Sequence, residues 1–147
     1  MPKEGLDQKQ VVETLNAILE LELAGVVRYT HYSLMIFGYA RIPIVKWMRD
    51  QASEALTHAA AAGEQITTLG GHPSLKIGKL LETRRHDIEH ILREAADHER
   101  EGIRLYKTLL DQATGTSVLL EEYARKMVSE EETHLSEIEK MLRRPDA

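Results

Sequence analysis

The positions of the prolines constrain the fold of this chain more than any other feature. Only four of its 147 residues are proline, at positions 2, 43, 73 and 145, and glycines gather near Pro73. Because proline removes a backbone donor and breaks helices, the long stretches between these positions are free to be helical. Apolar residues recur three and four residues apart in these stretches, as in amphipathic helices, and no strand pattern competes with them.

The apolar spacing and the helix-breaking residues together divide the chain into helices. Asp7 is the predicted N-cap of the first helix, and Gly70-Gly71 followed by Pro73 is a typical exit from the second. The connection from Gly70 to about Lys79 is long enough to carry the chain along the bundle. We therefore predict a single all-α domain, residues 1–147, forming an antiparallel four-helix bundle with a long crossover between its second and third helices. The predicted helices cover about residues 8–37, 44–70, 80–113 and 117–143.

Composition excludes several classes of protein. The chain has 19 basic and 24 acidic residues, so it lacks the positive charge that nucleic acids or anionic lipids require. Its opening MPKEGLDQKQ has no apolar stretch of signal-peptide type, and no run of about 18 apolar residues occurs. We expect a soluble cytoplasmic protein with no nucleic-acid or membrane partner. Since the chain has no cysteine, imidazole and carboxylate groups must hold any metal.

Each predicted helix carries an acid or a histidine on the apolar stripe that should be buried. An isolated buried carboxylate costs several kcal/mol unless it is paired, protonated or bound to a metal. Several such groups that converge in one core are most simply explained by a metal cluster. The residues are Glu22 in the first helix, His58 in the second, Glu99 in the third, and Glu131 with His134 in the fourth.

The spacing within the fourth helix supports metal binding. Glu131 and His134 form a Glu-x-x-His unit, which places both side chains on one face of a helix. The two can then bind one metal ion while the carboxylate bridges to a second.

The two halves of the chain also repeat each other. Glu22 precedes Tyr29 by seven residues, and Glu99 precedes Tyr106 by seven. The interval from Glu22 to His58 is 36 residues, and that from Glu99 to His134 is 35. An internal repeat of this kind is what a pseudo-two-fold site for two metal ions requires.

The same residues also admit interpretations without a metal. Glu131 and His134 could belong to a solvated acidic face, because Glu130-Glu131-Glu132 is a charge run. Glu22 and Glu99 also have acidic neighbours, and a lone histidine such as His58 is often a core residue. Tyr29 and Tyr106 are interpreted first as core aromatics rather than as electron donors or supports for the ligands. We predict exposed positions for His86, His90 and His98, and assign no role to His31 or His72.

With these motifs, the chain from the first helix to about Arg144 resembles the bacterioferritin branch of the ferritin-like superfamily. In that branch two iron ions are bound by one Glu from each of the first and third helices and by a Glu-x-x-His from each of the second and fourth. The resemblance implies Glu22 and Glu99 as terminal carboxylates, His58 as the second-helix imidazole, and Glu131 with His134 as the fourth-helix pair.

The sequence departs from the family pattern at three places. The second-helix bridging Glu would fall at Ala55, and the adjacent Glu54 is the candidate substitute. The haem-ligating methionine of the family would fall at Leu56, so haem is not predicted. Only 13 residues follow His134, too few for the family's fifth helix. We therefore expect a homo-oligomer, at least a dimer, without assuming a hollow shell.

The resemblance implies a ferroxidase-type oxidoreductase. Two iron ions per chain would bind as Fe(II) and be oxidised by dioxygen or peroxide, for iron storage or detoxification. Manganese or zinc would suit the same carboxylate and imidazole ligands. Two alternatives are a di-metal oxidase or peroxide scavenger of the rubrerythrin type and a structural or partner-binding bundle with a degenerate metal site. Ala55 favours the last of these.

Overall fold

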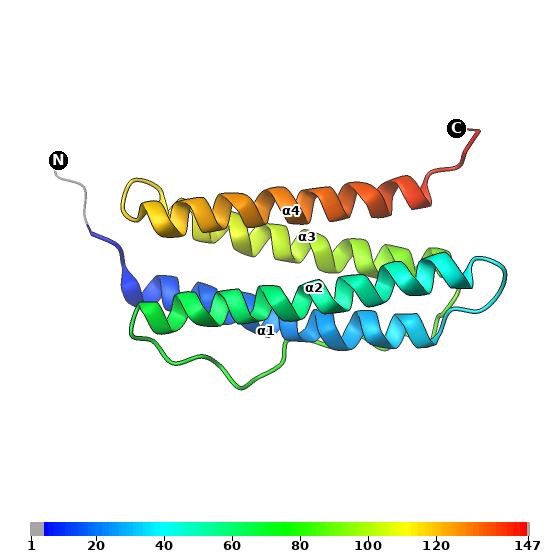
Figure 1. Ribbon diagram of the computed structural model, residues 1–147, viewed down its shortest axis with the longest axis horizontal. Coiled ribbons are helices and arrows are strands. Elements are labelled where there is room, and N and C mark those ends of the chain that lie inside the picture. The colour runs from blue at the N-terminus through cyan, green and yellow to red at the C-terminus, as the bar shows by residue number, and fades with distance from the viewer. Residues whose placement is uncertain (1–4, 147) are drawn as a thin grey trace.

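The computed structural model describes residues 5–146, whose four helices form an elongated bundle (Figure 1). Helices α1 and α2 form one hairpin, α3 and α4 form the other, and α1 also packs against α3. This arrangement confirms the prediction of an all-α antiparallel four-helix bundle. The ends of the predicted 1–147 domain, residues 1–4 and 147, lie outside the described part. The helices are α1 (Gln8–Leu34), α2 (Arg41–Thr68), α3 (Ile88–Ala113) and α4 (Val118–Leu142).

Local hydrogen bonds determine where the helices begin and end. Three helices begin at a residue whose side chain accepts a hydrogen bond from the backbone N–H three positions later, which satisfies one free donor of the first turn. At the end of α2, Gly70 has a φ of +76° and Gly71 N–H donates to the Ile66 carbonyl at 2.9 Å, a glycine-terminated exit. The three capping residues are Asp7 for α1, Asp87 for α3 and Ser117 for α4.

Residues 69–87 connect α2 to α3 and run along the bundle from one end to the other (Figure 1). The predicted crossover is therefore present, but it is longer than expected, because α3 begins at Ile88 rather than near residue 80. Gly78 N–H is bound to the Glu20 carbonyl at 2.8 Å, which ties the connection to α1. Arg84 has a φ of +58°, a value that a right-handed helix excludes.

The other helix boundaries differ by a few residues from the predicted ones. Helix α1 ends at Leu34 instead of residue 37, and α2 begins at Arg41 instead of residue 44. Pro43 lies in the first turn of α2, where the missing N–H would have no intrahelical partner. In the described residues that follow α4, 143–146, there is no fifth helix. No helix within residues 5–146 has the length and apolar character needed to cross a membrane.

Buried apolar residues form two clusters, one toward each end of the bundle. One cluster contains Ile18 of α1, Ala59 of α2, Tyr106 of α3 and Met127 of α4. The other contains Tyr29, Ala52, Ala95 and Ile138 of the same four helices. On every helix, the acid or histidine identified from the sequence falls between a member of one cluster and a member of the other. The polar residues therefore occupy a layer at the middle of an otherwise apolar core.

Candidate metal centre

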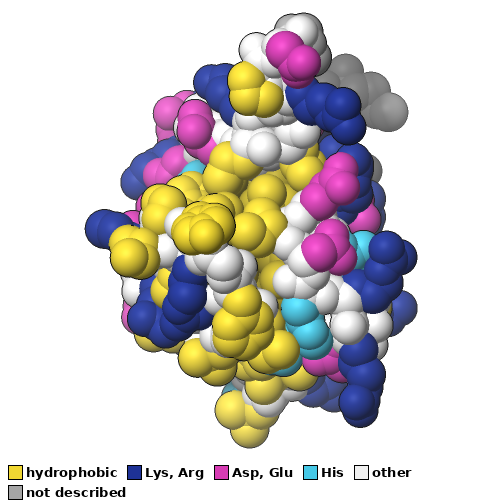
Figure 2. Space-filling view, turned by 90° about the vertical axis from the view of Figure 1, so that its right-hand side faces the viewer, with side chains coloured by type: hydrophobic (Ala, Val, Ile, Leu, Met, Phe, Trp, Pro, Cys, Tyr) yellow, Lys and Arg dark blue, Asp and Glu magenta, His cyan; other side chains and the backbone are white. Residues whose placement is uncertain are grey.

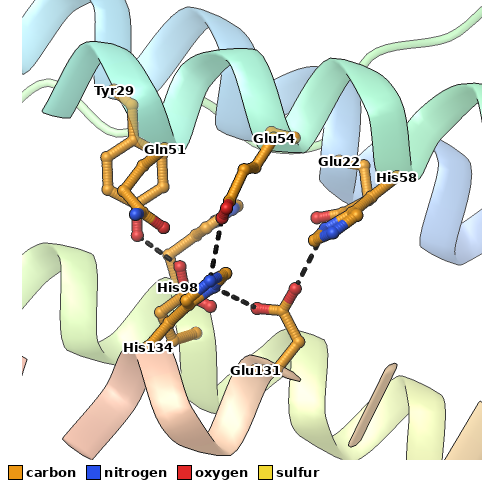
Figure 3. A pocket seen from close by; sticks show the side chains of 10 residues that line it. Glu22, Tyr29, Gln51, Glu54, His58, His98, Glu131 and His134 are labelled. Atoms are coloured by element: carbon orange, nitrogen blue, oxygen red, sulfur yellow. Dashed lines mark hydrogen bonds and ion pairs between the residues drawn. The ribbon is translucent and has the colours of Figure 1, made fainter. Parts of the chain in front are cut away.

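All four helices contribute a buried polar residue to this middle layer (Figure 3). Glu22, His58, Glu99 and Glu131 are only 5%, 8%, 4% and 4% exposed, respectively. His134 is partly buried one helical turn after Glu131. The five residues identified from the sequence are thus brought to one place in the core, and Glu54 lies at its edge.

Glu131 lies at the centre of the cluster. One of its carboxylate oxygens is 3.2 Å from Nδ1 of His58, and the other is 3.8 Å from Nδ1 of His134. Nδ1 of His58 is also 2.8 Å from Glu22. Two groups of potential metal ligands result, Glu22–His58–Glu131 and Glu99–Glu131–His134. Within each group the ligand atoms lie within 4.8 Å of one another, and Glu131 belongs to both.

The outward nitrogen of each imidazole meets a further carboxylate. Nε2 of His58 is 3.1 Å from Glu130, and Nε2 of His134 is 2.8 Å from Glu54. The two imidazole rings are stacked, with centroids 6.4 Å apart. Neither ligand group found among the described residues includes Glu54. Its carboxylate lies on the outer side of His134, which corresponds to the place of Glu130 on His58.

Two tyrosines connect the halves of the centre. The Tyr29 hydroxyl donates to Glu99 at 2.5 Å, and the Tyr106 hydroxyl donates to Glu22 at 3.1 Å. Each tyrosine thus binds the carboxylate that belongs to the other half of the sequence repeat. Both rings are core residues, as predicted, and their hydroxyls also hold the carboxylates of Glu99 and Glu22 in place.

Burial and mutual hydrogen bonding shift the pKa values of these groups. Burial raises the pKa of Glu22 to about 7 and that of Glu99 well above its usual range. Burial acts in the same direction on Glu131, but hydrogen bonds with Glu99 and with the two imidazoles outweigh it, and the pKa of Glu131 is lowered. Burial opposes protonation of His58, yet hydrogen bonds to Glu131 and Glu22 raise its pKa to about 10. Protons therefore balance much of the negative charge of the cluster.

These groups fit small divalent cations. The potential ligands are carboxylate oxygens and imidazole nitrogens, a set that suits iron, manganese or zinc. A cation would stabilise the ionised carboxylates and neutral imidazoles, so metal binding would release the protons that now occupy the cluster. The space enclosed there is about 10 Å³, close to the smallest volume that holds one water molecule. It admits an ion rather than an organic substrate.

The absence of a carboxylate at position 55 is matched by close packing around it. Gly25 of α1 lies opposite Ala55, and a Cβ on Gly25 would be 3.3 Å from the Ala55 Cβ. The same Cβ would be 2.9 Å from Nε2 of His98, whose Nδ1 faces the Arg28 guanidinium at 3.2 Å. Ala55 and His98 thus both pack against Gly25 at the edge of the cluster.

Sequence reasoning missed some residues that line the centre. The prediction that His98 is exposed was wrong, because His98 is buried and faces the cavity, as does Gln51 of α2. Both lie on the apolar faces of their helices, so the apolar periodicity of the sequence could have identified them as buried. The contact of Glu130 with His58 was not predicted, because Glu130 belongs to an acidic run that is typical of a solvent-exposed face.

A four-helix bundle with one long crossover and a carboxylate–histidine cluster at mid-core defines the ferritin-like class of proteins. Comparison with known families agrees with this assignment. Residues 12–146 match the model of the ferritin-like domain, and the chain belongs to this family.

Solved structures with the same fold cover nearly the whole chain. A ferritin-like, diiron-carboxylate protein from Bacillus anthracis is 26% identical, with a TM-score of 0.88 over 93% of this chain and 98% of that one. The bacterioferritin of Desulfovibrio desulfuricans is also 26% identical, with a TM-score of 0.80 over 92% and 79% of the two chains. A dodecameric thioferritin from Bacteroides fragilis is 23% identical, with a TM-score of 0.85 over 93% and 86%, and shows the fold alone. The comparison with curated proteins gave no match.

Proposed function

We propose that this protein binds two Fe(II) ions per chain at the mid-core cluster and oxidises them with dioxygen or peroxide, for iron storage or detoxification. One observation carries the proposal: Glu131 is shared by two groups of buried or partly buried potential ligands, as a carboxylate that bridges two ions must be. The comparisons support iron as the metal, because the Bacillus anthracis protein is described as a diiron-carboxylate protein and the Desulfovibrio desulfuricans structure contains a diiron site. Manganese and zinc are competitors for the same ligands.

In this proposal each ligand has its own role, which the contacts support. Glu22 and His58 would hold one ion, Glu99 and His134 would hold the other, and Glu131, which belongs to both ligand groups, would be shared between them. The apolar clusters on both sides keep bulk water and reductants away from the ions. The protein therefore contributes ligand positions and exclusion of side reactions rather than a covalent step.

The redox balance of the reaction is simple. Each Fe(II) loses one electron to become Fe(III). Two electrons and two protons convert one peroxide molecule into two water molecules, or one dioxygen molecule into one peroxide. Glu99 and His58, whose raised pKa values keep them protonated before iron binds, release protons beside the ions as they become ligands.

An anaerobic Fe(II) titration followed by exposure to air tests the proposal. We expect two Fe(II) ions to bind per chain, and a ferric absorbance band to develop in air. Glu131→Gln keeps the size of the side chain but removes its charge, and should abolish most of the binding and the band. Glu132→Gln is the matched control, because Glu132 is exposed and faces Lys107 at 3.3 Å instead of the cluster.

The outcomes of this titration separate the alternatives. Full retention of the ferric band in a folded Glu131→Gln variant contradicts the proposal. Wild-type protein that folds but binds no iron identifies a structural bundle with a degenerate site. Repeated turnover of peroxide with an external reductant, exceeding oxidation of the bound iron, identifies a peroxide scavenger instead.

We further propose that the chain forms a homo-oligomer. Figure 2 views the bundle from the end where α1 passes into α2, and hydrophobic side chains gather across that face. Exposed apolar groups of this extent favour association. Light scattering measures the mass directly, and a monomer at micromolar concentration contradicts the proposal. The exposed apolar residues at this end include Leu34, Phe37, Tyr39 and Ile42.

A further inference from the structure

A second cluster of potential metal ligands lies away from the core centre. His31 is in the last turn of α1, and Glu82 and His86 are in the crossover just before α3. Nε2 of His31 is 3.0 Å from one Glu82 oxygen, and Nε2 of His86 is 3.4 Å from the other. The two imidazole rings have centroids 5.6 Å apart. Sequence reasoning assigned no role to His31, because its partners are more than fifty residues away along the chain.

The atoms of this cluster make poor hydrogen bonds, but their separations suit ligands of a single metal ion. Among the described residues, neither Nε2 atom makes a hydrogen bond, although both are shielded from solvent. Ligand atoms about 2.1 Å from a tetrahedral zinc ion lie about 3.4 Å from one another. The nitrogen–oxygen separations of 3.0 and 3.4 Å are close to this value, and the three ligand atoms lie within 4.8 Å of one another.

We propose that His31, Glu82 and His86 form a surface site for a divalent transition-metal ion of the zinc type. Two imidazoles and one carboxylate are a complete protein ligand set for an open zinc site, which keeps its fourth position for water. The side chains of His31, Glu82 and His86 are 38%, 48% and 25% exposed, so the cluster lies at the surface although both Nε2 atoms are covered. Calcium and magnesium are disfavoured, because both prefer oxygen ligands.

Metal binding at this site would fasten the crossover to α1. Nearby, the connection is held by the hydrogen bond from Gly78 to Glu20 and by one from the Thr83 hydroxyl to Glu94 at 2.6 Å. A metal ion would add a third link, between the end of α1 and the residues that lead into α3. This site is separate from the proposed iron centre and does not depend on iron oxidation.

Titration of the metal-free chain with Co(II) tests the proposal, because the visible bands of bound Co(II) report each equivalent. We expect the double variant His31→Gln/His86→Gln to bind one equivalent fewer than the wild type. His90→Gln is the matched control: its Nε2 also lies 3.0 Å from a carboxylate, that of Glu94, but among the described residues His90 belongs to no group of three potential ligands. An equal loss in His90→Gln, or no loss in the double variant, overturns the proposal.

Two further measurements keep this test independent of the iron centre. Glu131→Gln should reduce binding in the core but leave intact the equivalent that the double variant loses. Zn(II) should slow backbone hydrogen exchange in residues 79–87 of the wild type and leave it unchanged in the double variant. Unchanged exchange in the wild type at saturating Zn(II) contradicts the predicted link between the crossover and α1.

Discussion

At the residue scale, the two histidines of the core centre are held in the same way. Each presents Nδ1 to Glu131 and Nε2 to a more exposed carboxylate, Glu130 for His58 and Glu54 for His134. A carboxylate on the far nitrogen of a ligating imidazole fixes its tautomer and increases its basicity. The charge run that contains Glu130 is therefore more than a solvated face.

Removal of either outer carboxylate should weaken iron binding without unfolding the chain. Because Glu54 and Glu130 are 50% and 38% exposed, their replacement leaves no cavity in the core. We expect Glu54→Ala and Glu130→Ala each to lower Fe(II) affinity about ten-fold, since partners of this kind support the ligand rather than bind the metal. Anaerobic Fe(II) titration measures the affinity, with Glu132→Ala as control. Wild-type affinity in both variants would show that these carboxylates do not support the imidazoles.

The sequence was sufficient to identify the five residues of the two ligand groups, but neither their individual contacts nor the lining residues His98 and Gln51. Glu22, Glu99 and Glu131 were recognisable because a charged residue on an apolar stripe conflicts with burial. The pairing of Glu54 with His134 could not be predicted. Glu54 lies outside the apolar stripe of α2, and its partner belongs to α4, which is distant in sequence. The side-chain conformations that decide such contacts depend on packing between helices that are distant in sequence.

At the scale of the elements, small residues let α1, α2 and α3 approach closely beside the centre. A Cβ at Gly25 would be 2.9 Å from His98 and 3.3 Å from Ala55, distances at which one of the neighbours must move. Gly63 of α2 has no atom within 4 Å of its hypothetical Cβ. Gly25 and Gly63 therefore differ in the space available to a side chain.

Alanine at these two positions should have opposite effects on stability. Gly25→Ala should lower the free energy of unfolding by about 1–3 kcal/mol, because it overpacks the contact between three helices. Gly63→Ala should raise it by about 0.5–1 kcal/mol, because alanine is the better helix former and space is available. Urea unfolding followed by circular dichroism measures both. If Gly25→Ala is as stable as Gly63→Ala, the helices are not in the close contact described.

Helix number and order followed from the sequence, whereas some helix boundaries did not. The start of α3 was the largest error, because Leu80 and Leu81 continue an apolar pattern although both are exposed in the crossover. The left-handed backbone of Arg84 excludes a helix there, and the aspartate cap at Asp87 starts α3 at Ile88. Tertiary contacts of the crossover, such as Gly78 with Glu20, have no local signature in the sequence.

At the scale of the whole molecule, one buried histidine couples folding to pH. His98 lies in the core beside the Arg28 guanidinium, and burial together with that charge lowers its pKa from 6.5 to about 4. Because the folded pKa lies below the unfolded one, the neutral ring contributes stability fully above pH 6.5. That contribution is lost as the pH falls from about 6.5 to 4, when the unfolded chain takes up the proton first.

His98→Gln should therefore flatten the acid side of the stability profile. We expect the wild type to lose about 3 kcal/mol more than this variant between pH 7 and pH 4, the equivalent of the pKa difference. Urea unfolding in a chelating buffer across this range measures the loss, and His72→Gln provides an exposed-histidine control. Parallel profiles for the wild type and His98→Gln would mean that the ring does not titrate as described.

The crossed tyrosines also bear on how such a molecule arises. Tyr29 donates a hydrogen bond to Glu99 of the opposite hairpin, and Tyr106 donates one to Glu22. A peptide made of one hairpin would leave its tyrosine and its carboxylate without partners, whereas two copies packed face to face would restore both bonds. Duplication and fusion of a gene for a self-pairing hairpin would yield this arrangement, with the crossover as the later join.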